Sequence, residues 1–464
     1  MLESMLRCVT LAAAATPLLV ACGGGTPSDP GAINPSQCSG STCANQGPPA
    51  TQAAATALCP SAAAIAQNTY LGGSGSGEVV SLKIDPTQMT YSLTFLASPI
   101  PASATGPLQE TRTGLTVTGA VQHPPAGSLP SAAQIACAFQ LQAGTGTLPQ
   151  GGTYTTAYNA SNPPTIYVGF GVAGGGIPGA TIGFSGDILA AALYPTDQAR
   201  TFDFYPFIGF SSVDTNIADL QGTYNALLYH ILPSNNFAPM AVVSQEKYDA
   251  SGNCSVPSGA TNASCETATS QWTADANGSY FDSANAPYLE PAGPLLGLIP
   301  GLGLPLRNGA TAHLILGKLN NAIVPIVVRT GYVNETSVQV DDESGIALMA
   351  PATTLAQGSI DGSYIGADSN FDYTASLING ASGGFLKPST MTTEGQFTLD
   401  YSQTHPGLIG VTDTAGNTGS VIAVGGLYGI FINGEENGGV TPSSANSATP
   451  NQPYFGVGAL IQPQ

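Results

Sequence analysis

Short runs in which apolar and polar residues alternate restrict the fold of this chain more than any other feature of its 464 residues. In residues 78–84, Val80, Leu82 and Ile84 fall on one side of an extended chain, with a serine and a lysine on the other. This period of two is typical of a half-buried strand, because successive side chains of a strand point to opposite faces. A turn sequence with a proline leads into a second run at 89–95, and the pair predicts a β-hairpin.

Strand-like runs of this kind recur along the whole chain. They lie at 114–121, 165–171, 222–230, 312–317, 396–401 and 420–431. The chain contains 58 Gly and 36 Pro, which disfavour long helices. Because 42% of the residues are hydrophobic, with 18 Tyr and 15 Phe, disorder throughout is excluded. We therefore predict an all-β protein of two or three antiparallel modules, each resembling a β-sandwich or β-barrel.

A weak internal repeat indicates how these modules are arranged. Leu-Gln-Gly-Thr-Tyr at 220–224 recurs as Ile-Asp-Gly-Ser-Tyr at 360–364, and a turn of the form Asp-x-x-Gly-Asn follows each copy, at 249–253 and 413–417. Glycine permits positive φ and aspartate caps its own backbone, so both turns predict hairpins. The repeat predicts duplicated β modules, with chance in a chain rich in small residues as the alternative. The predicted modules are 63–215, 216–355 and 356–464.

The Gly-x-Tyr that ends each copy, with Tyr224 and Tyr364, resembles the Gly-x-Trp that opens lipocalin- and avidin-type barrels. In those barrels the aromatic ring plugs the closed end, and the glycine lets the chain pass close by. Tyrosine stands here in place of tryptophan, and no companion motif of the lipocalins is present. The resemblance therefore implies a barrel-like architecture and carries no function with it.

The beginning of the chain has the three parts of a secretory signal. These parts are a basic residue at Arg7, an uncharged apolar run at 8–20, and small residues before Cys22. The run is too short for a membrane-spanning helix and contains Pro17. Leu-Val-Ala-Cys at 19–22 resembles the lipobox of bacterial lipoproteins, in which signal peptidase cuts before a cysteine that carries acyl chains. The resemblance implies a signal peptide over residues 1–21 and lipidation of Cys22; an ordinary secretory signal is the alternative.

A flexible linker is predicted after the lipidated cysteine, over residues 22–62, because residues 23–50 consist mainly of small and polar types. Each acyl methylene buried in a membrane contributes about 0.8 kcal/mol, so two or more chains anchor a protein stably. Gly23 in place of aspartate implies, by the same resemblance, the outer membrane of the cell envelope. The lipobox, the linker and the Gly/Thr/Tyr-rich β repeats together resemble a family of uncharacterised bacterial lipoproteins of proteobacteria, whose function is unknown.

Cysteine usage points to an oxidising compartment. Cys8 leaves with the signal peptide and Cys22 takes the lipid, which leaves an even number for disulfides. The disulfide candidates are Cys38, Cys43, Cys59, Cys137, Cys254 and Cys265. Six cysteines allow 15 connectivities, of which we favour the close pairs Cys38–Cys43 and Cys254–Cys265, with Cys59 left for Cys137. Zinc is the alternative, but there is no C-x-x-C and no histidine at ligand spacing, so we predict no metal and no cofactor.

Charge excludes one class of partner. The chain has 9 Lys and Arg against 28 Asp and Glu, a net charge of −19. Such a surface repels phosphate backbones, so nucleic acid is excluded as a partner. The predicted partner is the membrane, through the lipid anchor, and a protein or glycan partner stays open.

No motif of known chemistry stands out. Gly-Ala-Ser-Gly-Gly at 380–384 fits the G-x-S-x-G pattern but lies in a glycine-rich turn between strand-like runs, where a nucleophile elbow needs a strand that leads into a helix. The acidic clusters 341–343 and 435–436 allow calcium, but we predict solvated turns. The apolar run 291–306 predicts a loop packed on a sheet, with a membrane-dipping or partner-binding loop as the alternative. The four histidines are His123, His230, His313 and His405, and nothing marks a catalytic triad among them.

We therefore predict a membrane-anchored lipoprotein of the cell envelope, without enzymatic activity, that serves in binding or in surface structure. A surface hydrolase acting on glycans is one alternative, although a catalytic carboxylate pair cannot be picked from 28 acidic residues. Part of a membrane β-barrel is another, although Pro463-Gln464 lacks the aromatic ending usual there.

Overall fold

The computed structural model is nearly all β, as the alternating runs predict. It describes residues 58–103, 107–129, 131–182, 200–233, 237–255, 272–284, 286, 288–289, 309–334, 339–370, 372–388, 392–435 and 452–461. The helices of these segments are short: α1 (Ala62–Gln67), α2 (Ala132–Ala136) and the 3-10 helix η3 (Ile217–Leu220). Within these segments no helix has the length and apolar character needed to cross a membrane. The predicted signal peptide and most of the predicted linker lie outside the described residues.

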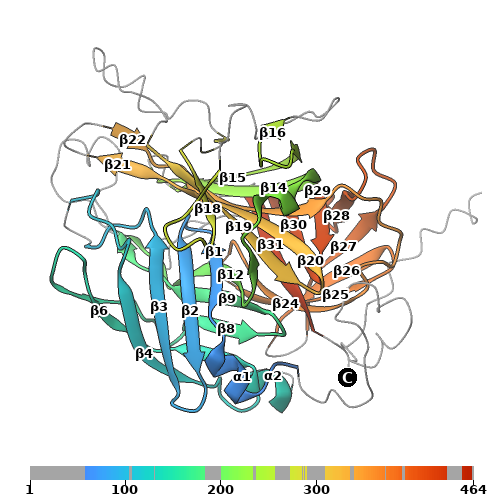
Figure 1. The fold of residues 1–464 in the computed structure, drawn as a ribbon. Helices are drawn as coiled ribbons and strands as arrows, with labels where there is room; N and C mark the ends of the chain where they lie inside the picture. Colours follow the sequence, from blue (N-terminus) through green and yellow to red (C-terminus); the bar gives the residue numbers. More distant parts are fainter. Residues whose placement is uncertain are drawn as a thin grey trace, which may run out of the picture. The chain divides into compact units, whose positions relative to one another are not determined.

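The first sheet closes on itself. Its strands are β1 (Tyr70–Ser74), β2 (Val79–Asp85), β3 (Thr90–Ala97), β4 (Thr116–Gln122), β5 (Ala138–Leu141), β8 (Thr165–Val168), β9 (Val172–Pro178) and β12 (Phe204–Phe210). They run in the order β3-β2-β1-β12-β9-β8-β5-β4, and β4 pairs back with β3. The short strands β6 (Thr145–Thr147) and β7 (Thr153–Thr155) extend the sheet beyond β4. We call the closed ring the first barrel; it is blue to green in Figure 1.

The hairpin predicted from the first alternating run is formed by β2 and β3, which pair in register from Asp85 and Thr90 to Val80 and Phe95. In β2 the alternate residues Val80, Leu82 and Ile84 are buried, as the period of two requires. The Asp85 carboxylate accepts two backbone N–H bonds in the turn, of 2.8 and 2.9 Å. This is the aspartate-capped turn that the sequence favours.

The second sheet is open. Its strands are β13 (Val213–Asp214), β14 (Gly222–Leu232), β15 (Ala238–Tyr248), β16 (Cys254–Ser255), β17 (Thr273–Ala274), β18 (Phe281–Ser283), β19 (Thr311–Leu319), β20 (Ala322–Thr330) and β23 (Ser344–Pro351). The order is β16-β15-β14-β23-β20-β19-β18-β17, with β13 on β19. β14 and β23 are buried along nearly all their length, because both faces of this sheet are covered. Two small hairpins, β10 (Thr181–Ile182) with β11 (Arg200–Thr201) and β21 (Tyr332–Asn334) with β22 (Gln339–Asp341), lie outside the three large sheets.

The third sheet is a closed barrel in which each strand pairs with the next along the chain. Its strands are β24 (Gly362–Asp368), β25 (Tyr373–Asn379), β26 (Ser382–Leu386), β27 (Thr393–Asp400), β28 (Ile409–Asp413), β29 (Thr418–Val424), β30 (Leu427–Glu435) and β31 (Gln452–Ile461). β31 returns to pair with β24. We call it the second barrel; it is orange to red in Figure 1. Tyr364 of the repeated Gly-x-Tyr is buried in its core, and its hydroxyl donates to the Ile360 carbonyl at 2.7 Å.

The two repeated turns have the same hydrogen bonds. The carboxylate of Asp249 accepts the backbone N–H groups two and four residues on, at 2.8 and 2.9 Å, and the side-chain amide of Asn253 at 2.9 Å. Asp413 accepts the three equivalent bonds in its turn, which ends at Asn417, at 2.9, 2.8 and 2.7 Å. The Asp-x-x-Gly-Asn sequence therefore specifies one turn geometry in both sheets.

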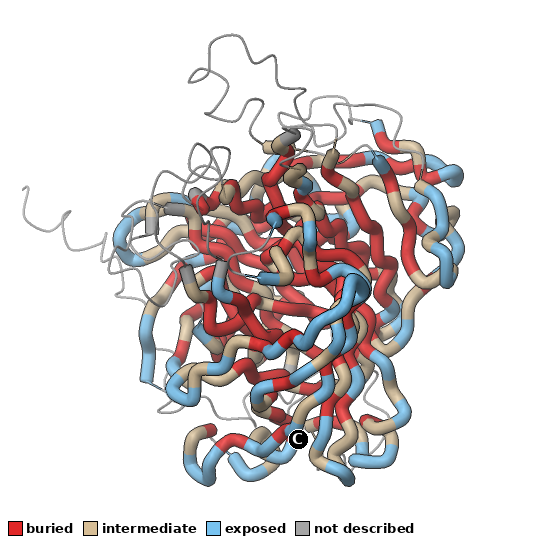
Figure 2. Tube along the Cα trace, turned by 90° about the vertical axis from the view of Figure 1, so that its left-hand side faces the viewer, coloured by how far each residue is buried: buried red, intermediate tan, exposed pale blue. Residues whose placement is uncertain are grey.

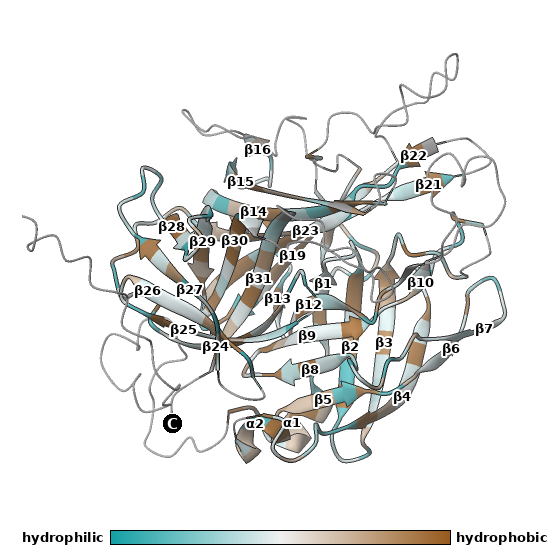
Figure 3. Cartoon of the chain, turned by 180° about the vertical axis from the view of Figure 1, so that it is seen from behind, coloured by the Kyte–Doolittle hydropathy of each residue, from teal (hydrophilic) through white to brown (hydrophobic). Residues whose placement is uncertain are grey.

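One cluster of buried side chains joins the three sheets. It includes Val80 of the first barrel, Ile326 of the open sheet and Ile422 of the second barrel. Buried residues follow the strands, and exposed residues gather in the connections (Figure 2). The same strands carry the apolar stretches in Figure 3. Because one core includes residues of all three sheets, it does not separate the chain at 215 and 355, and these module boundaries stay a prediction.

The two barrels also touch through Tyr373 of β25. Its ring stacks on Phe204 of β12 with centroids 4.8 Å apart. Its hydroxyl accepts the Thr165 N–H at 2.7 Å and donates to the Pro163 carbonyl at 2.9 Å. This contact between residues about 200 positions apart places β24 and β25 beside β8, β9 and β12.

Candidate functional site

A pocket of about 740 Å³, including the part open to solvent, lies where the three sheets meet. Its walls are β9 and β12 of the first barrel, β14 and β23 of the open sheet, and β24 and β31 of the second barrel. Most of the lining is apolar, and it includes Tyr205, Ile231, Ile346, Ile365 and Phe455. Its position between sheets and its mostly apolar lining are those of a small-molecule site.

A second pocket, of about 780 Å³, adjoins the first. Val172, Gly174, Ile365 and Ala459 line both pockets. The two therefore adjoin each other between the barrels, and together we call them the crevice. Its outer end is formed by further apolar residues, of which Phe170 has 45% of its surface exposed.

Two glycines keep part of the crevice open. A Cβ atom added to Gly174 would meet only the Phe207 carbonyl oxygen, at 3.5 Å, and one added to Gly75 would meet only Pro206 Cδ, at 3.9 Å. Neither glycine has a positive φ that would require glycine. A side chain at either position would therefore be tolerated by the backbone and would occupy crevice volume.

Asp368, at the end of β24, is the one residue with a carboxyl group among the described residues that line the crevice, and none of them is basic. One carboxyl oxygen accepts the N–H groups of Asn370 and Asp372 at 2.9 and 3.0 Å. Burial, and then the charge of Asp372, raise the pKa of Asp368 to about 8, although its hydrogen bonds oppose the shift. This carboxyl group is therefore mainly protonated at pH 7.

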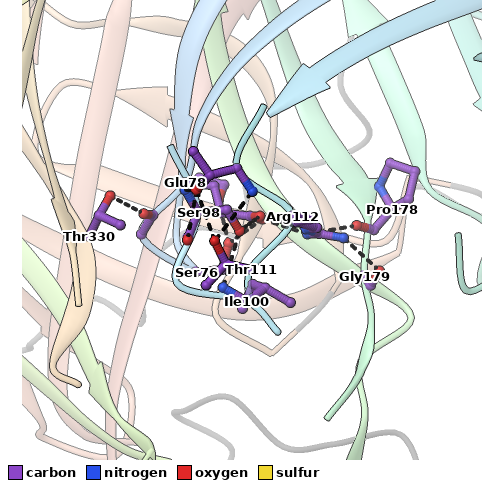
Figure 4. Close-up of polar contacts among 12 residues, drawn as sticks. Ser76, Glu78, Ser98, Ile100, Thr111, Arg112, Pro178, Gly179 and Thr330 are labelled. Atoms are coloured by element: carbon purple, nitrogen blue, oxygen red, sulfur yellow. Dashed lines mark hydrogen bonds and ion pairs between the residues drawn. The ribbon is translucent and has the colours of Figure 1, made fainter. Parts of the chain in front are cut away.

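Inside the first barrel, Glu78 and Arg112 form a fully buried ion pair (Figure 4). Arg112 also donates to the carbonyls of Pro178 and Gly179, at 3.3 and 3.2 Å. Ser98 donates to the Glu78 carboxylate at 2.6 Å. Because each charged group is saturated with partners, this cluster stabilises the barrel and offers no free group for chemistry.

The acidic cluster 341–343 is buried, so the predicted solvated turn is wrong. Arg329 pairs with Asp341 at 2.7 Å, and His230 pairs with Glu343 at 2.7 Å. Burial by itself raises the pKa of Glu343, but the hydrogen bond and charge of His230, with the charge of Arg329, lower it to about 2. His230 on β14 lies 113 positions before Glu343, and Arg329 on β20 lies 12 positions before Asp341 on a different strand, so no local pattern shows the pairs. In the other cluster, residue 436 lies outside the described residues.

The remaining predicted positions do not assemble an active site in the described part of the chain. His313 pairs with Asp282 at 2.6 Å, but its Nε2 has no hydrogen-bond partner, so no serine completes a triad there. His123 contacts a backbone carbonyl at 2.9 Å. Ser382 of the G-x-S-x-G pattern begins β26 in a strand–turn–strand setting. No group of three His, Cys, Asp or Glu that could hold a metal ion is present in these segments.

A disulfide joins Cys59 to Cys137, and Cys254 is also disulfide-bonded. Cys137 and Leu58 both line the crevice, so the first bridge holds part of its outer wall. The other cysteine positions lie outside the described residues, namely Cys8, Cys22, Cys38, Cys43 and Cys265, as does the apolar run 291–306.

Sequence reasoning missed the crevice. Its walls come from six strands between β9 and β31, and no single stretch carries a signal for it. The one local hint is the Gly-rich strand β9, Val-Ala-Gly-Gly-Gly-Ile-Pro, which a packed interior strand does not need.

A family described as "Protein of unknown function (DUF2957)" matches residues 90–459. No curated protein matches the chain. Among solved structures, it is similar to a double mutant of the vaccine antigen Transferrin Binding Protein B from Haemophilus parasuis, with 11% identity, 84% of this chain and 75% of that chain covered, and a TM-score of 0.25. It is also similar to isotype 1 Transferrin binding protein B from Neisseria meningitidis, with 13% identity, 83% and 66% covered, and a TM-score of 0.17. These TM-scores are too low to carry over a fold or a function.

Proposed function

The chain belongs to the DUF2957 family, whose function is unknown, and from that premise we propose that it is a binding protein of the cell envelope that takes an apolar ligand into the crevice. The observation that carries the proposal is the crevice itself: two adjoining, mainly apolar pockets between three sheets. Concave apolar sites with few polar groups are typical of small-molecule binding.

Chemistry of the lining favours binding over glycan hydrolysis. A glycosidase needs two carboxyl groups about 5 to 10 Å apart across the scissile bond. The described lining of the crevice holds one, on Asp368, and its other walls are mostly apolar. A sugar would lose hydrogen bonds to water there without replacing them.

The location in the envelope belongs to the same proposal. It is supported by the lipobox at residues 19–22 and the polar linker that follows. Disulfides at Cys59–Cys137 and at Cys254 suit an exported protein, because they persist in oxidising compartments. Lipidation of Cys22 would then hold the crevice near a membrane surface.

The test is titration with N-phenyl-1-naphthylamine, a neutral apolar dye whose fluorescence rises in apolar sites. We expect saturable binding to the wild-type protein and at least tenfold weaker binding to Gly174→Leu, because Gly174 lines both pockets and the leucine side chain would occupy their volume. Gly395→Leu is the matched control. It changes a strand glycine of β27 whose added Cβ has one neighbour, at 3.7 Å, and which does not line the crevice.

The proposal fails if the dye does not bind, or if both leucine variants bind it like the wild type. Thermal unfolding of each variant separates a blocked site from a lost fold. Gly75→Val, at the other end of the crevice, repeats the test at an independent position.

A further inference from the structure

We infer that the crevice takes one acyl chain of a membrane lipid, and that its outer end meets the lipid surface. This inference rests on the proposed function and deepens it by naming the class of ligand and the direction of entry. We call the outer end the mouth; its described residues include Leu58, Gln134, Phe170, Leu319 and Asn320.

The side chains that β24 turns towards the crevice are apolar. Ile365 and Ala367 fall on the face that lines it, whereas Tyr364 falls on the opposite face, in the core of the second barrel. Asp368 shares the face of Tyr364, and its carboxyl group hydrogen-bonds Tyr454 of the same core. This carboxyl group therefore belongs to the inside of the second barrel and offers the crevice no charge.

Strand β31 presents an apolar face in the same way. Phe455, Val457 and Ala459 alternate along it, line the crevice and pack with the cluster that joins the three sheets. The hydroxyl of Ser369, which also lines the first pocket, accepts the backbone N–H of Phe455 at 3.0 Å. A hydrocarbon chain suits such a space, because its burial removes apolar surface from water, whereas a polar head group would lose its hydrogen bonds to water there.

Amide side chains lie at the mouth instead. Gln134 of α2 and Asn320 of the turn between β19 and β20 line the second pocket and not the first. The described lining of the second pocket holds no charged side chain, and the chain's net charge of −19 repels anionic head groups. A lipid would therefore enter chain first and leave an uncharged or zwitterionic head group at the mouth.

Phe170 gives the mouth an apolar contact with its surroundings. Three large hydrophobic side chains are exposed in the described part of the chain, Tyr158, Phe170 and Tyr332, and Phe170 is the most exposed, at 45%. It is the one of the three that lines the crevice. It lies at the tip of the β8–β9 hairpin, before Gly171, whose φ of +85° permits the tight turn. An exposed aromatic ring at the rim of an apolar opening is typical of a surface that meets a partner or a membrane.

The proposed lipid anchor reaches the folded body at this same place. Leu58, where the described residues begin, lines the second pocket, and residues 23–57 separate it in sequence from Cys22. The disulfide from Cys59 to Cys137 fixes this point of attachment beside α2. A tether that joins the body at the mouth brings the mouth, before other faces, towards the surface that holds the anchor. One phenylalanine ring is too small to hold a protein on a bilayer, so the contact depends on the tether.

Contact between the mouth and lipid is tested by fluorescence quenching. The lipidated full-length protein is held on phosphatidylcholine vesicles whose acyl chains carry bromine, which quenches tryptophan that reaches the hydrocarbon. Phe170→Trp places a tryptophan at the mouth, and Tyr158→Trp places one at an exposed position that does not line the crevice. The wild type, whose one tryptophan is Trp272, supplies the background. We expect about threefold stronger quenching in Phe170→Trp than in Tyr158→Trp, because a side chain held at the interface reaches the acyl boundary.

Uptake of the acyl chain is tested with phosphatidylcholine that carries pyrene at the end of one chain. Labelled chains that meet in a vesicle give excimer emission, whereas a chain alone in the crevice gives monomer emission. The wild type should convert excimer to monomer emission until each protein has taken up one labelled lipid. Phe170→Ser should slow this conversion about fivefold through the lost apolar contact. Gly174→Leu should abolish it, and the controls Gly395→Leu and Tyr158→Ser should retain it.

Thermal unfolding shows that each variant is folded, and dye binding separates the two proposals. Equal quenching of the two introduced tryptophans, or no gain of monomer emission, in a protein that binds N-phenyl-1-naphthylamine would overturn the inference and leave the proposed function intact. Two other results would do the same. One is the absence of an acyl chain on Cys22, which removes the tether. The other is dye binding that is blocked in the lipidated protein and restored in Cys22→Ala, because the protein's own acyl chain would then be the occupant. If the dye binds neither form, both proposals fail.

Discussion

Arg112 donates two hydrogen bonds of 2.6 Å to the Glu78 carboxylate, at a place in the first barrel where neither side chain reaches solvent. The guanidinium also lies 4.0 Å from the ring centroid of Phe95. Glu78 and Arg112 are 34 positions apart, so the pair ties the residue before β2 to the loop before β4. Its energetic role follows from burial, because a buried charge that loses its partner is costly.

Glu78→Gln should lower the free energy of unfolding by about 3 kcal/mol, because it leaves the Arg112 charge unpaired. The double variant Glu78→Gln/Arg112→Met should lose less than Arg112→Met and Glu78→Gln added together. Urea unfolding measures both. Lys318→Met is the control, since the Lys318–Asp214 pair has a half-exposed lysine and should contribute less than about 1 kcal/mol. Equal losses of unfolding free energy in Glu78→Gln and Lys318→Met would show that burial of the Glu78–Arg112 pair does not increase its contribution to stability.

Glu343 should make the protein sensitive to acid. Its pKa is about 2 in the folded protein against an ordinary 4.5, so its contribution is complete above pH 4.5 and is lost as the pH falls towards 2. The wild type should therefore exceed Glu343→Gln in unfolding free energy by up to about 3 kcal/mol at pH 6. This excess should shrink between pH 4.5 and 2, as measured by urea unfolding at each pH. An excess that stays constant over that range would show that the His230 pair does not hold the carboxylate ionised.

Loss of the Cys59–Cys137 bridge should weaken both stability and binding. The bridge spans 78 residues, and a loop of that size corresponds to roughly 4 kcal/mol in the chain-entropy account. The double variant Cys59→Ala/Cys137→Ala should unfold at a lower urea concentration. It should also bind N-phenyl-1-naphthylamine more weakly, because Leu58 and Cys137 line the outer end of the crevice. If the folded double variant bound the dye like the wild type, the disulfide would not be needed for the shape of the crevice.

Cys22→Ala should release the protein from membranes, because the lipobox resemblance places the acyl chains on Cys22. Cells grown with labelled fatty acid should incorporate the label into the wild type and not into this variant. Fractionation should move the variant from the membrane pellet to the soluble fraction. If the label still attaches to Cys22→Ala, the lipid is carried elsewhere.

Local sequence predicted local structure well. The alternation in residues 78–84 predicts a strand and hairpin that the structure contains, because side chains that alternate between apolar and polar fit a strand with one face on the core. The Asp-x-x-Gly-Asn turns at 249–253 and 413–417 have matching bonds, because side chain and backbone lie within five residues. In both cases the deciding interactions are short in sequence.

Two features that the sequence did not predict, the buried acidic cluster and the crevice, depend on contacts between different strands. The solvated turn expected at 341–343 is a set of buried ion pairs, since Arg329 and His230 come from other strands. The crevice likewise depends on how two barrels and an open sheet pack. Asp368, one of its lining residues, looks in sequence like any other turn aspartate. Its altered pKa arises only after folding removes water from it.

The pairing of β31 with β24, which closes the second barrel, has a consequence for biosynthesis. β31 pairs with β24 across almost a hundred residues, and Phe455, Val457 and Ala459 of β31 also form one wall of the crevice. A chain emerging from the ribosome or from an export channel therefore has no crevice until β31 has been delivered. The proposed site therefore cannot bind a ligand while the chain is incomplete. A bound ligand would indicate that β31 has been synthesised and has paired with β24.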